Sequence, residues 1–150
     1  MSLDLTADLY EACQQISPRH PDYATQSIED AFDWSSLSCC LFDRLYLVVF
    51  RSLWQPEADL DLLREHDDRA FEEAIASGGL LRYFKGNANE QGECLSFCLW
   101  ETREQARQAA DGASHRSAAD VSAQMYLSYS LKRYWIRKVG ETLVFEPIQM

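Results

Sequence analysis

The alternation of apolar and polar positions along the chain predicts a set of short strands. Residues 45–50 are apolar throughout, which is typical of a strand that is buried on both faces. Residues 80–85 and 94–100 have strand composition, and the asparagine and glycine residues between them indicate a turn. Residues 131–139 alternate basic and apolar side chains and residues 142–145 form a short apolar run, so we expect two further strands near the C-terminus.

Helical periodicity fills the intervals between these strands. Pro56 suits the first turn of a helix that we expect over residues 57–77, where apolar side chains form one stripe. Thr102 and Gln105 have the capping-box spacing, which predicts the start of a short helix. A further helix is predicted from about residue 114, because a set of positions recurs at three- and four-residue spacing. Those positions are His115, Ala118, Ala119, Ser122, Met125, Tyr126 and Tyr129.

The resulting order is strand, helix, strand, strand, helix, strand, which is the βαββαβ arrangement of the ferredoxin-like motif. We therefore expect an α+β fold in which an antiparallel sheet carries helices on one face. Residues 1–44 form an N-terminal extension with a short amphipathic helix, which we expect to pack on a core domain of residues 45–150. The sheet has more apolar surface than its helices can cover, so we expect a homodimer in which two sheets face each other as a dimeric α+β barrel.

Composition and charge narrow the range of functions. A chain of 150 residues is long enough for one domain with a substantial core. The net charge of −10 argues against binding to nucleic acid or to an anionic membrane surface, because both need clustered lysine and arginine. No apolar run approaches the roughly 20 residues that span a bilayer, and the acidic N-terminus is unlike a signal peptide. We expect a cytoplasmic protein.

Neither the cysteines nor the histidines have the spacing of a metal site. The five cysteines are odd in number and none stands in a C-x-x-C motif, so we interpret them as reduced thiols of a cytosolic protein. His20, His66 and His115 are widely separated, and no phosphate-binding loop, dinucleotide fingerprint or nucleophile elbow occurs. We therefore expect no metal and no organic cofactor, and a small molecule as the ligand.

Asp67 and His115 are the candidate catalytic residues. Asp67 falls within the apolar stripe of the 57–77 helix, where a carboxylate is costly unless it is hydrogen-bonded or paired. It is either a structural acid or a general base in a pocket. His115 lies at the first turn of its predicted helix, where the helix dipole favours a neutral imidazole and bound anions. It is either a capping or packing residue or an acid/base group.

Aromatic and cationic side chains on the same predicted elements are candidates to line the pocket. Tyrosine and arginine suit hydrogen bonds to an enolate or phenolate oxygen, and Arg133 is also the first cation that we expect to pair with Asp67. Arg82 and Tyr83 project to opposite faces of their strand, so only one of them can join the pocket wall. The candidate substrate-binding residues are Tyr83, Trp100, Tyr126, Arg133, Trp135 and Phe71.

Six segments form an ordered set of motifs between residues 46 and 135. They are Val48–Ser52, Asp67–Ala74, Ser77–Tyr83, Gly92–Trp100, His115–Ala118 and Tyr126–Tyr134. This set is similar to the pattern of an uncharacterised, mainly fungal family of small proteins. The resemblance implies a dimeric α+β barrel fold, whose wider group includes cofactor-free monooxygenases, polyketide cyclases, isomerases, dehydratases and haem-degrading enzymes; such a fold does not fix function. The family pattern has a histidine where this chain has Phe71, so an activity that uses that histidine would be lost or altered here.

Two classes of function fit these observations. The first is an enzyme without an organic cofactor, which uses acid/base groups for cyclisation, isomerisation or elimination of a hydrophobic or aromatic metabolite. The alternative is a non-catalytic small-molecule-binding or assembly protein. A haem-handling protein with His115 as axial ligand, or a cofactor-free monooxygenase, ranks below both of these classes. The two classes differ in whether Asp67 and His115 face one cavity.

Overall fold

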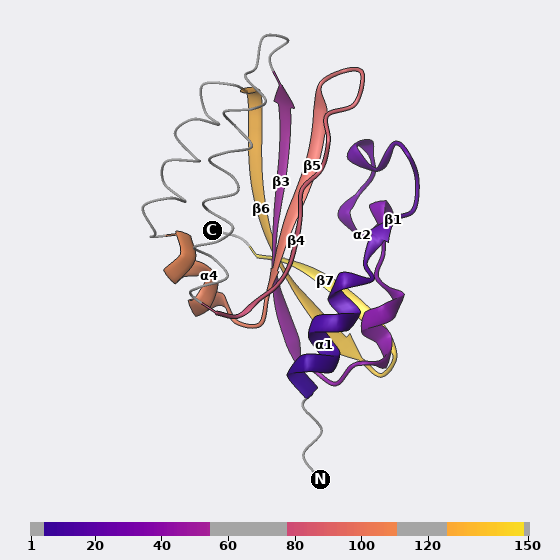
Figure 1. Cartoon of the computed structure of the whole chain (residues 1–150), viewed down its shortest axis with the longest axis vertical. Helices are drawn as coiled ribbons and strands as arrows, with labels where there is room; N and C mark the ends of the chain where they lie inside the picture. The colour runs from indigo at the N-terminus through magenta and orange to yellow at the C-terminus, as the bar shows by residue number, and fades with distance from the viewer. Residues whose placement is uncertain (1–4, 55–77, 111–125, 149–150) are drawn as a thin grey trace.

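The computed structural model describes residues 5–54, 78–110 and 126–148, and these build a five-stranded antiparallel sheet (Figure 1). The strand order is β4-β5-β3-β6-β7. With β7 set aside, this is the order that a βαββαβ ferredoxin-like chain gives, so the predicted fold class is confirmed for the sheet. The strands are β3 (Arg44–Trp54), β4 (Leu80–Phe84), β5 (Glu93–Trp100), β6 (Tyr126–Val139) and β7 (Thr142–Ile148).

Each of the strands expected from the sequence is present, and the predicted capping box is confirmed. Helix α4 (Arg103–Ala110) begins after Thr102, whose Oγ1 accepts a hydrogen bond from the backbone N–H of Gln105 at 3.2 Å. The same hydroxyl donates to Oε1 of Gln105 at 2.9 Å. The first of these bonds satisfies a helix N–H that would otherwise lack a partner. The helix expected over residues 57–77 lies outside the described residues.

The prediction that Tyr126 and Tyr129 belong to a helix is wrong. Both lie in β6, where Tyr126 is opposite Trp54 and Tyr129 is opposite Ser52 of β3. Their three-residue spacing fits a helix, but residues 126–139 also alternate in a way that fits a long strand. Pairing with β3 along the whole of that strand favours the strand, because each added pair contributes both ladder hydrogen bonds and cross-strand side-chain contacts.

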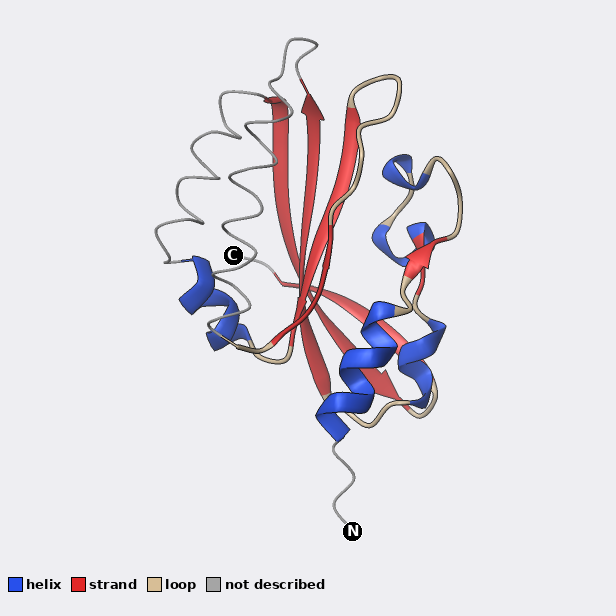
Figure 2. Ribbon diagram, in the orientation of Figure 1, coloured by secondary structure: helices blue, strands red, loops and turns tan. Residues whose placement is uncertain are grey.

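The residues before β3, which we call the N-terminal segment (residues 5–42), fold into short elements on one side of the sheet (Figure 2). A small antiparallel pair, β1 with β2, joins them. The elements are α1 (Leu5–Gln14), β1 (Ser17–Pro18), η1 (Tyr23–Thr25), α2 (Ile28–Ala31), β2 (Phe32–Asp33) and η2 (Ser35–Cys39), where η denotes a 3-10 helix. The boundary at residue 44 between an extension and a core domain stays a prediction.

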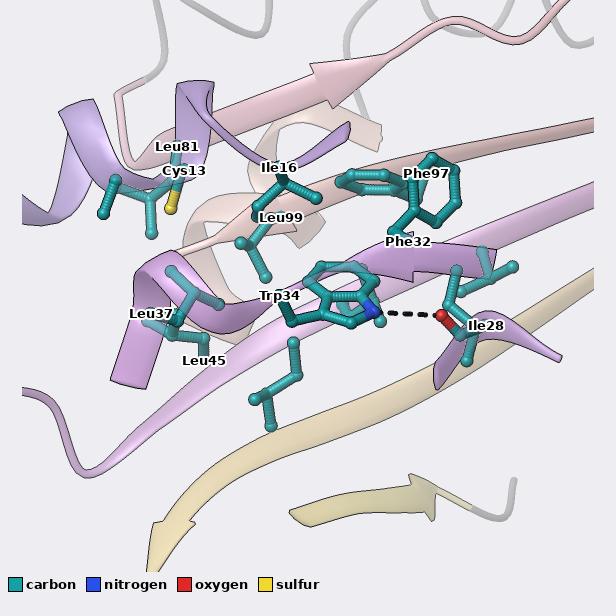
Figure 3. Packing of buried hydrophobic residues seen from close by; sticks show 14 of the residues in the cluster. Cys13, Ile16, Ile28, Phe32, Trp34, Leu37, Leu45, Leu81, Phe97 and Leu99 are labelled. Carbon is teal, nitrogen blue, oxygen red and sulfur yellow. Dashed lines mark hydrogen bonds between the residues drawn. The ribbon is translucent and has the colours of Figure 1, made fainter. Parts of the chain in front are cut away.

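The N-terminal segment covers one face of the sheet, which we call the extension face. Phe32 is fully buried there, with its ring centroid 5.0 Å from that of Phe97, and Trp34 lies 5.2 Å from the same ring (Figure 3). The indole N–H of Trp34 donates to the carbonyl of Ile28 at 3.0 Å, so the tryptophan is buried without an unsatisfied donor. The buried sheet residues of this face are Leu45, Leu47, Val49, Leu81, Leu95, Phe97, Leu99 and Ile136.

This arrangement corrects the reason for expecting a homodimer. The surplus apolar face of the sheet was assigned to a second copy of the chain, but residues of the same chain cover it. The sequence predicts that the N-terminal extension packs on the core, but it does not show which face the extension covers, because Phe32 of β2, Trp34 and Leu37 of η2 share no periodicity. Dimerisation through some other surface stays a prediction.

Candidate functional site

The opposite face of the sheet packs against α4 and is the face that carries candidate chemistry; we call it the α4 face. Ala106 and Ala109 of α4 are buried against it. Because both side chains are small, the helix approaches the sheet without filling the space between them. A cavity of about 100 Å³ remains, which we call the α4 pocket. Its lining residues are Tyr46, Val48, Phe50, Cys98, Trp100, Ala106, Arg107, Ala109, Leu131 and Arg133.

An aromatic row crosses three neighbouring strands at one end of this pocket. Tyr46 of β3 is paired with Trp100 of β5 on one side and with Trp135 of β6 on the other. The rings of Tyr46 and Trp135 are 5.3 Å apart at an interplanar angle of 61°, a favourable edge-to-face geometry. Tyr46 and Trp100 are both buried. The row therefore forms an apolar, aromatic wall at this end of the pocket.

A second row lies beside the first and is more polar. Tyr83 of β4 is paired with Cys98 of β5, Cys98 with Val48 of β3, and Val48 with Arg133 of β6. Since paired residues of an antiparallel sheet project to the same side, Tyr83 and Arg133 belong to the α4 face together with the aromatic row. Across the sheet, this row therefore presents the phenol of Tyr83, the thiol of Cys98, the isopropyl group of Val48 and the guanidinium of Arg133, in that order.

Arginines surround the aromatic row although the chain as a whole has a net charge of −10. Arg133 and Arg107 line the α4 pocket. The guanidinium carbon of Arg44 is 3.9 Å from the ring centroid of Trp135, and that of Arg103 is 6.0 Å from the ring centroid of Tyr46. The described lining residues of the pocket include no aspartate or glutamate, but Glu146 of β7 is paired with Trp135 at the end of the row and forms an ion pair with Arg137 at 2.8 Å. The guanidinium groups that line the pocket are suited to an anion beside the aromatic surface.

The buried Nε of Arg103 is a further group that could bind an anion near Tyr46. It has no hydrogen-bond partner among the described residues. A buried N–H without a partner is costly, most of all on a cation. A ligand oxygen that reached this group would remove that cost.

The structure brings four of the eight predicted site residues together on one face: Tyr83, Trp100, Arg133 and Trp135. Tyr126 is the first residue of β6, opposite Trp54, and its side chain is outside the described part of the molecule. Asp67, Phe71 and His115 also lie outside the described residues, so their roles stay predictions.

The prediction that Arg82 and Tyr83 project to opposite faces is confirmed. Nη1 of Arg82 donates to the carbonyl of Gln14 in α1 at 2.7 Å, on the extension face. Burial lowers the pKa of Arg82, and the guanidinium has a structural partner there. Tyr83 is the residue that joins the α4 face.

Sequence reasoning missed Tyr46 and Arg107 as members of the site. Tyr46 has the same strand phase as Val48, which is visible in the sequence, but only the register shows that it lies between Trp100 and Trp135. Arg107 follows Arg103 by one helical turn, and that spacing could have indicated two cations on one side of α4.

A wider groove of about 410 Å³ lies at the other end of the sheet. It contains Arg51, Glu93 and several hydroxyl side chains, and its β6 residues are exposed. Arg51 holds the N-terminal segment by donating to the carbonyls of Ala24 at 3.0 Å and Gln26 at 2.5 Å. Its cation therefore has a structural role, so we regard the α4 pocket as the better candidate site.

We also searched the described part of the chain for a metal site, a membrane-spanning helix and a reactive cysteine. It contains no group of three or more His, Cys, Asp or Glu side chains that could hold a metal ion. None of its helices is both long enough and apolar enough to cross a membrane. Burial raises the pKa of the Cys13 thiol to about 12, so this cysteine is neutral at physiological pH and unsuited to nucleophilic chemistry.

The sheet resembles several solved structures. SnoaB, a cofactor-independent oxygenase from Streptomyces nogalater, matches with a TM-score of 0.51 and 10% identity, over 65% of this chain and 97% of that chain. Rv0793 from Mycobacterium tuberculosis matches with a TM-score of 0.51 and 15% identity, over 63% and 95%. A Nitrosomonas europaea protein, provisionally assigned to the antibiotic biosynthesis monooxygenases, matches with a TM-score of 0.53 and 14% identity, over 66% and 94%. At these identities the likeness shows the fold alone.

Sequence relatives identify the family. UPF0643 protein PB2B2.08 of Schizosaccharomyces pombe is 31% identical in an alignment of 111 residues that covers 69% of this chain and 50% of that protein. The chain thus spans about half the length of that curated relative. The family model described as PB2B2.08-like matches residues 2–147. The fungal resemblance predicted from the motifs is confirmed, and the chain belongs to the PB2B2.08-like family.

Proposed function

We propose that the α4 pocket binds a small, planar, aromatic molecule that carries a negative charge, and that the chain acts on it as a cofactor-independent oxygenase. The observation that supports binding is the aromatic row of Tyr46, Trp100 and Trp135 with arginines on both sides of it. An aromatic wall favours contact with another aromatic ring, and guanidinium groups favour a carboxylate or phenolate at the edge of that ring. A cavity of about 100 Å³ is on the order of one aromatic ring, so a fused two- or three-ring molecule would place one ring in the pocket and the others outside it.

The proposed reaction class follows from the fold and from the charge of the pocket. SnoaB, which shares the fold, is a cofactor-independent oxygenase. An oxygenase without a cofactor needs a substrate whose own enolate or phenolate supplies the electrons to O₂. Positive groups that stabilise the developing oxyanion lower the barrier to its formation. Arg133 and Arg107 are placed for this role, and Tyr83 is a candidate hydrogen-bond donor beside them.

Acid/base groups would assist by removing the proton that creates the enolate. Asp67 and His115 are the residues predicted for this step, with Phe71 and Tyr126 as further candidates to line the pocket. The same two groups would suffice for cyclisation, isomerisation or elimination. We place those reactions second, because the fold comparisons favour oxygenation.

A non-catalytic binding protein is the second candidate function. It is favoured by the small size of the pocket and by the tight packing of the aromatic row. We propose the cytoplasm as the site of action for either function, in keeping with an odd number of cysteines outside any metal-binding spacing.

The test of binding compares an anionic probe with its neutral isostere. Isothermal titration of the full chain with 2-naphthoate and 2-naphthamide is expected to show tighter binding of the carboxylate. Arg133→Gln should weaken naphthoate binding by about tenfold or more, because a hydrogen bond to a charged group contributes roughly 1.5–3 kcal/mol. Arg137→Gln is the matched control, since Arg137 lies on the same strand and forms an exposed ion pair with Glu146 at 2.8 Å, outside the described lining of the pocket. Equal affinities for the two probes would refute the proposal.

The test of catalysis measures O₂ uptake with anthrone. The C10 proton leaves, the enolate passes electrons to O₂, and the resulting C10 hydroperoxide loses water, so one anthrone and one O₂ give one anthraquinone and one water. The chain is expected to accelerate this conversion, and Arg133→Gln is expected to slow it while Arg137→Gln does not. Uptake no faster than the uncatalysed rate would favour the binding protein.

A further inference from the structure

We infer that the N-terminal segment takes the place of a second sheet, so that this chain does not form a face-to-face barrel dimer and no ligand site lies between two facing sheets. An antiparallel sheet with two apolar faces must have both of them covered to be stable in water. On the α4 face, part of the cover is α4. On the extension face, the cover comes from residues 9–42 of the same chain.

At the centre of the extension face, the sheet's apolar side chains are already fully buried by residues of the same chain. Leu47, Phe97, Leu99 and Ile136, which span three adjacent strands, each have 0% of their surface exposed in the single chain. A stable interface between two proteins buries roughly 800 Å² on each partner. A second sheet could reach these side chains only after the N-terminal segment had left.

Hydrogen bonds near both ends of the N-terminal segment attach it to the sheet. At the end of α1, the side chain of Gln14 donates to the carbonyl of Leu81 while Arg82 donates to the carbonyl of Gln14. At the other end, Nζ of Lys138 in β6 donates to the carbonyl of Cys40. The segment is thus attached to strands on both sides of the sheet centre. If it left the sheet, each of these hydrogen bonds would be lost and its groups would be exposed to water.

Hydrogen bonds in the middle of the N-terminal segment also attach it to the sheet. Arg51 of β3 donates to the carbonyls of Ala24 and Gln26, and the backbone N–H of Asn87 donates to the hydroxyl of Tyr23 at 3.1 Å. These bonds connect the segment to the centre of the sheet and to the β4–β5 loop. A loosely associated tail would not engage three separate parts of the fold in this way.

The burial of Cys13 and Arg82 agrees with an N-terminal segment that is packed on the sheet. The Cys13 thiol has 0% exposure, and burial raises its pKa; burial also lowers the pKa of Arg82 beside it. Cys39, in the same segment, is exposed. Labelling with a maleimide under native conditions should therefore modify Cys39 quickly and leave Cys13 unmodified.

The deciding experiment is light scattering of the full chain after size exclusion, combined with isotope-filtered NOE spectroscopy on a mixture of labelled and unlabelled protein. A mass near 17.3 kDa, with NOEs between the Trp34 and Phe97 rings within one chain, is expected. A dimer that keeps those NOEs within one chain also supports the inference, because its interface must lie elsewhere.

A dimer in which Trp34–Phe97 NOEs run between chains also supports the inference, because the segment of one copy would then cover the sheet of the other and the two sheets would not face each other. The result that would overturn the inference is a dimer that lacks those NOEs and labels Cys13 as fast as Cys39, because the sheets would then face each other directly. Neither result bears on naphthoate binding, so failure of this inference and failure of the proposed function are distinguishable.

Discussion

Replacing Leu37 by alanine tests whether the N-terminal segment is part of the folded core. Leu37 lies in η2, has no exposed surface and packs in the cluster that includes Leu45 and Trp34 (Figure 3). Leu41 stands four residues further along the same segment, but 71% of its surface is exposed. The same substitution at the two positions therefore differs almost only in burial, and Leu41→Ala is the matched control.

The expected magnitude follows from the atoms removed. Leucine to alanine deletes three carbons, which at about 0.8 kcal/mol per buried carbon amounts to about 2.4 kcal/mol of transfer free energy. The cavity left behind adds to this, so we expect Leu37→Ala to lower the free energy of unfolding by roughly 2.5–4 kcal/mol. Leu41→Ala should change it by no more than about 0.5 kcal/mol.

Equilibrium unfolding in urea, followed by tryptophan fluorescence, measures the difference. With a slope of roughly 2 kcal/mol per molar urea, Leu37→Ala should lower the midpoint by about 1–2 M. Leu41→Ala should leave the midpoint within about 0.3 M of the parent. If the two variants unfold at the same urea concentration, the N-terminal segment is not packed on the sheet and the account of the extension face fails.

Two further predictions concern single positions. Gly86→Ala should destabilise the fold more than Gly140→Ala, because a Cβ at Gly86 would lie 2.1 Å from the backbone oxygen of Leu95. A Cβ at Gly140 meets nothing within 4 Å, so that variant carries only the cost of alanine at a φ of +64°, on the order of 1 kcal/mol. Similar urea midpoints for the two variants would contradict this. Burial raises the pKa of Cys13 from 9.0 to about 12, so the neutral thiol stabilises the fold fully below pH 9 and this contribution is lost as the pH rises toward 12. Cys13→Ala should flatten that part of the pH dependence of stability, and an unchanged slope above pH 9 would count against burial of the thiol.

The sheet was predictable from the sequence because its signals are local. The apolar run of β3, the asparagine and glycine residues between β4 and β5, and the capping box at Thr102 each lie within a few residues of chain. Their order alone gives the ferredoxin-like strand order. The opposite projection of Arg82 and Tyr83 follows from the two-residue period of a strand and needed no further information.

What could not be predicted depends on contacts between distant parts of the chain. Trp34 packs on Phe97, and Gln14 bonds the backbone of Leu81, yet no local pattern connects these pairs. The helical assignment of Tyr129 failed for the same reason, since its strand conformation comes from pairing with Ser52. Local propensity is a weak guide wherever tertiary pairing decides the outcome.

The candidate site was predictable in part. Tyr83, Trp100, Arg133 and Trp135 were expected from residue type and strand phase, and they do share the α4 face. Tyr46 was not expected, because its place between two tryptophans is set by the registers of β3 with β5 and with β6. A shift of either register by one residue would turn it to the other face.

The four tryptophans allow the most direct test of the α4 pocket as the binding site. Each indole N–H gives one signal in a proton–nitrogen correlation spectrum, and two of the four, Trp100 and Trp135, belong to the aromatic row while Trp34 lies on the extension face. Titration with 2-naphthoate is predicted to shift the Trp100 and Trp135 signals and to leave Trp34 unchanged. Shifts confined to Trp34 or Trp54, with Trp100 and Trp135 unmoved, would contradict the assignment of the site.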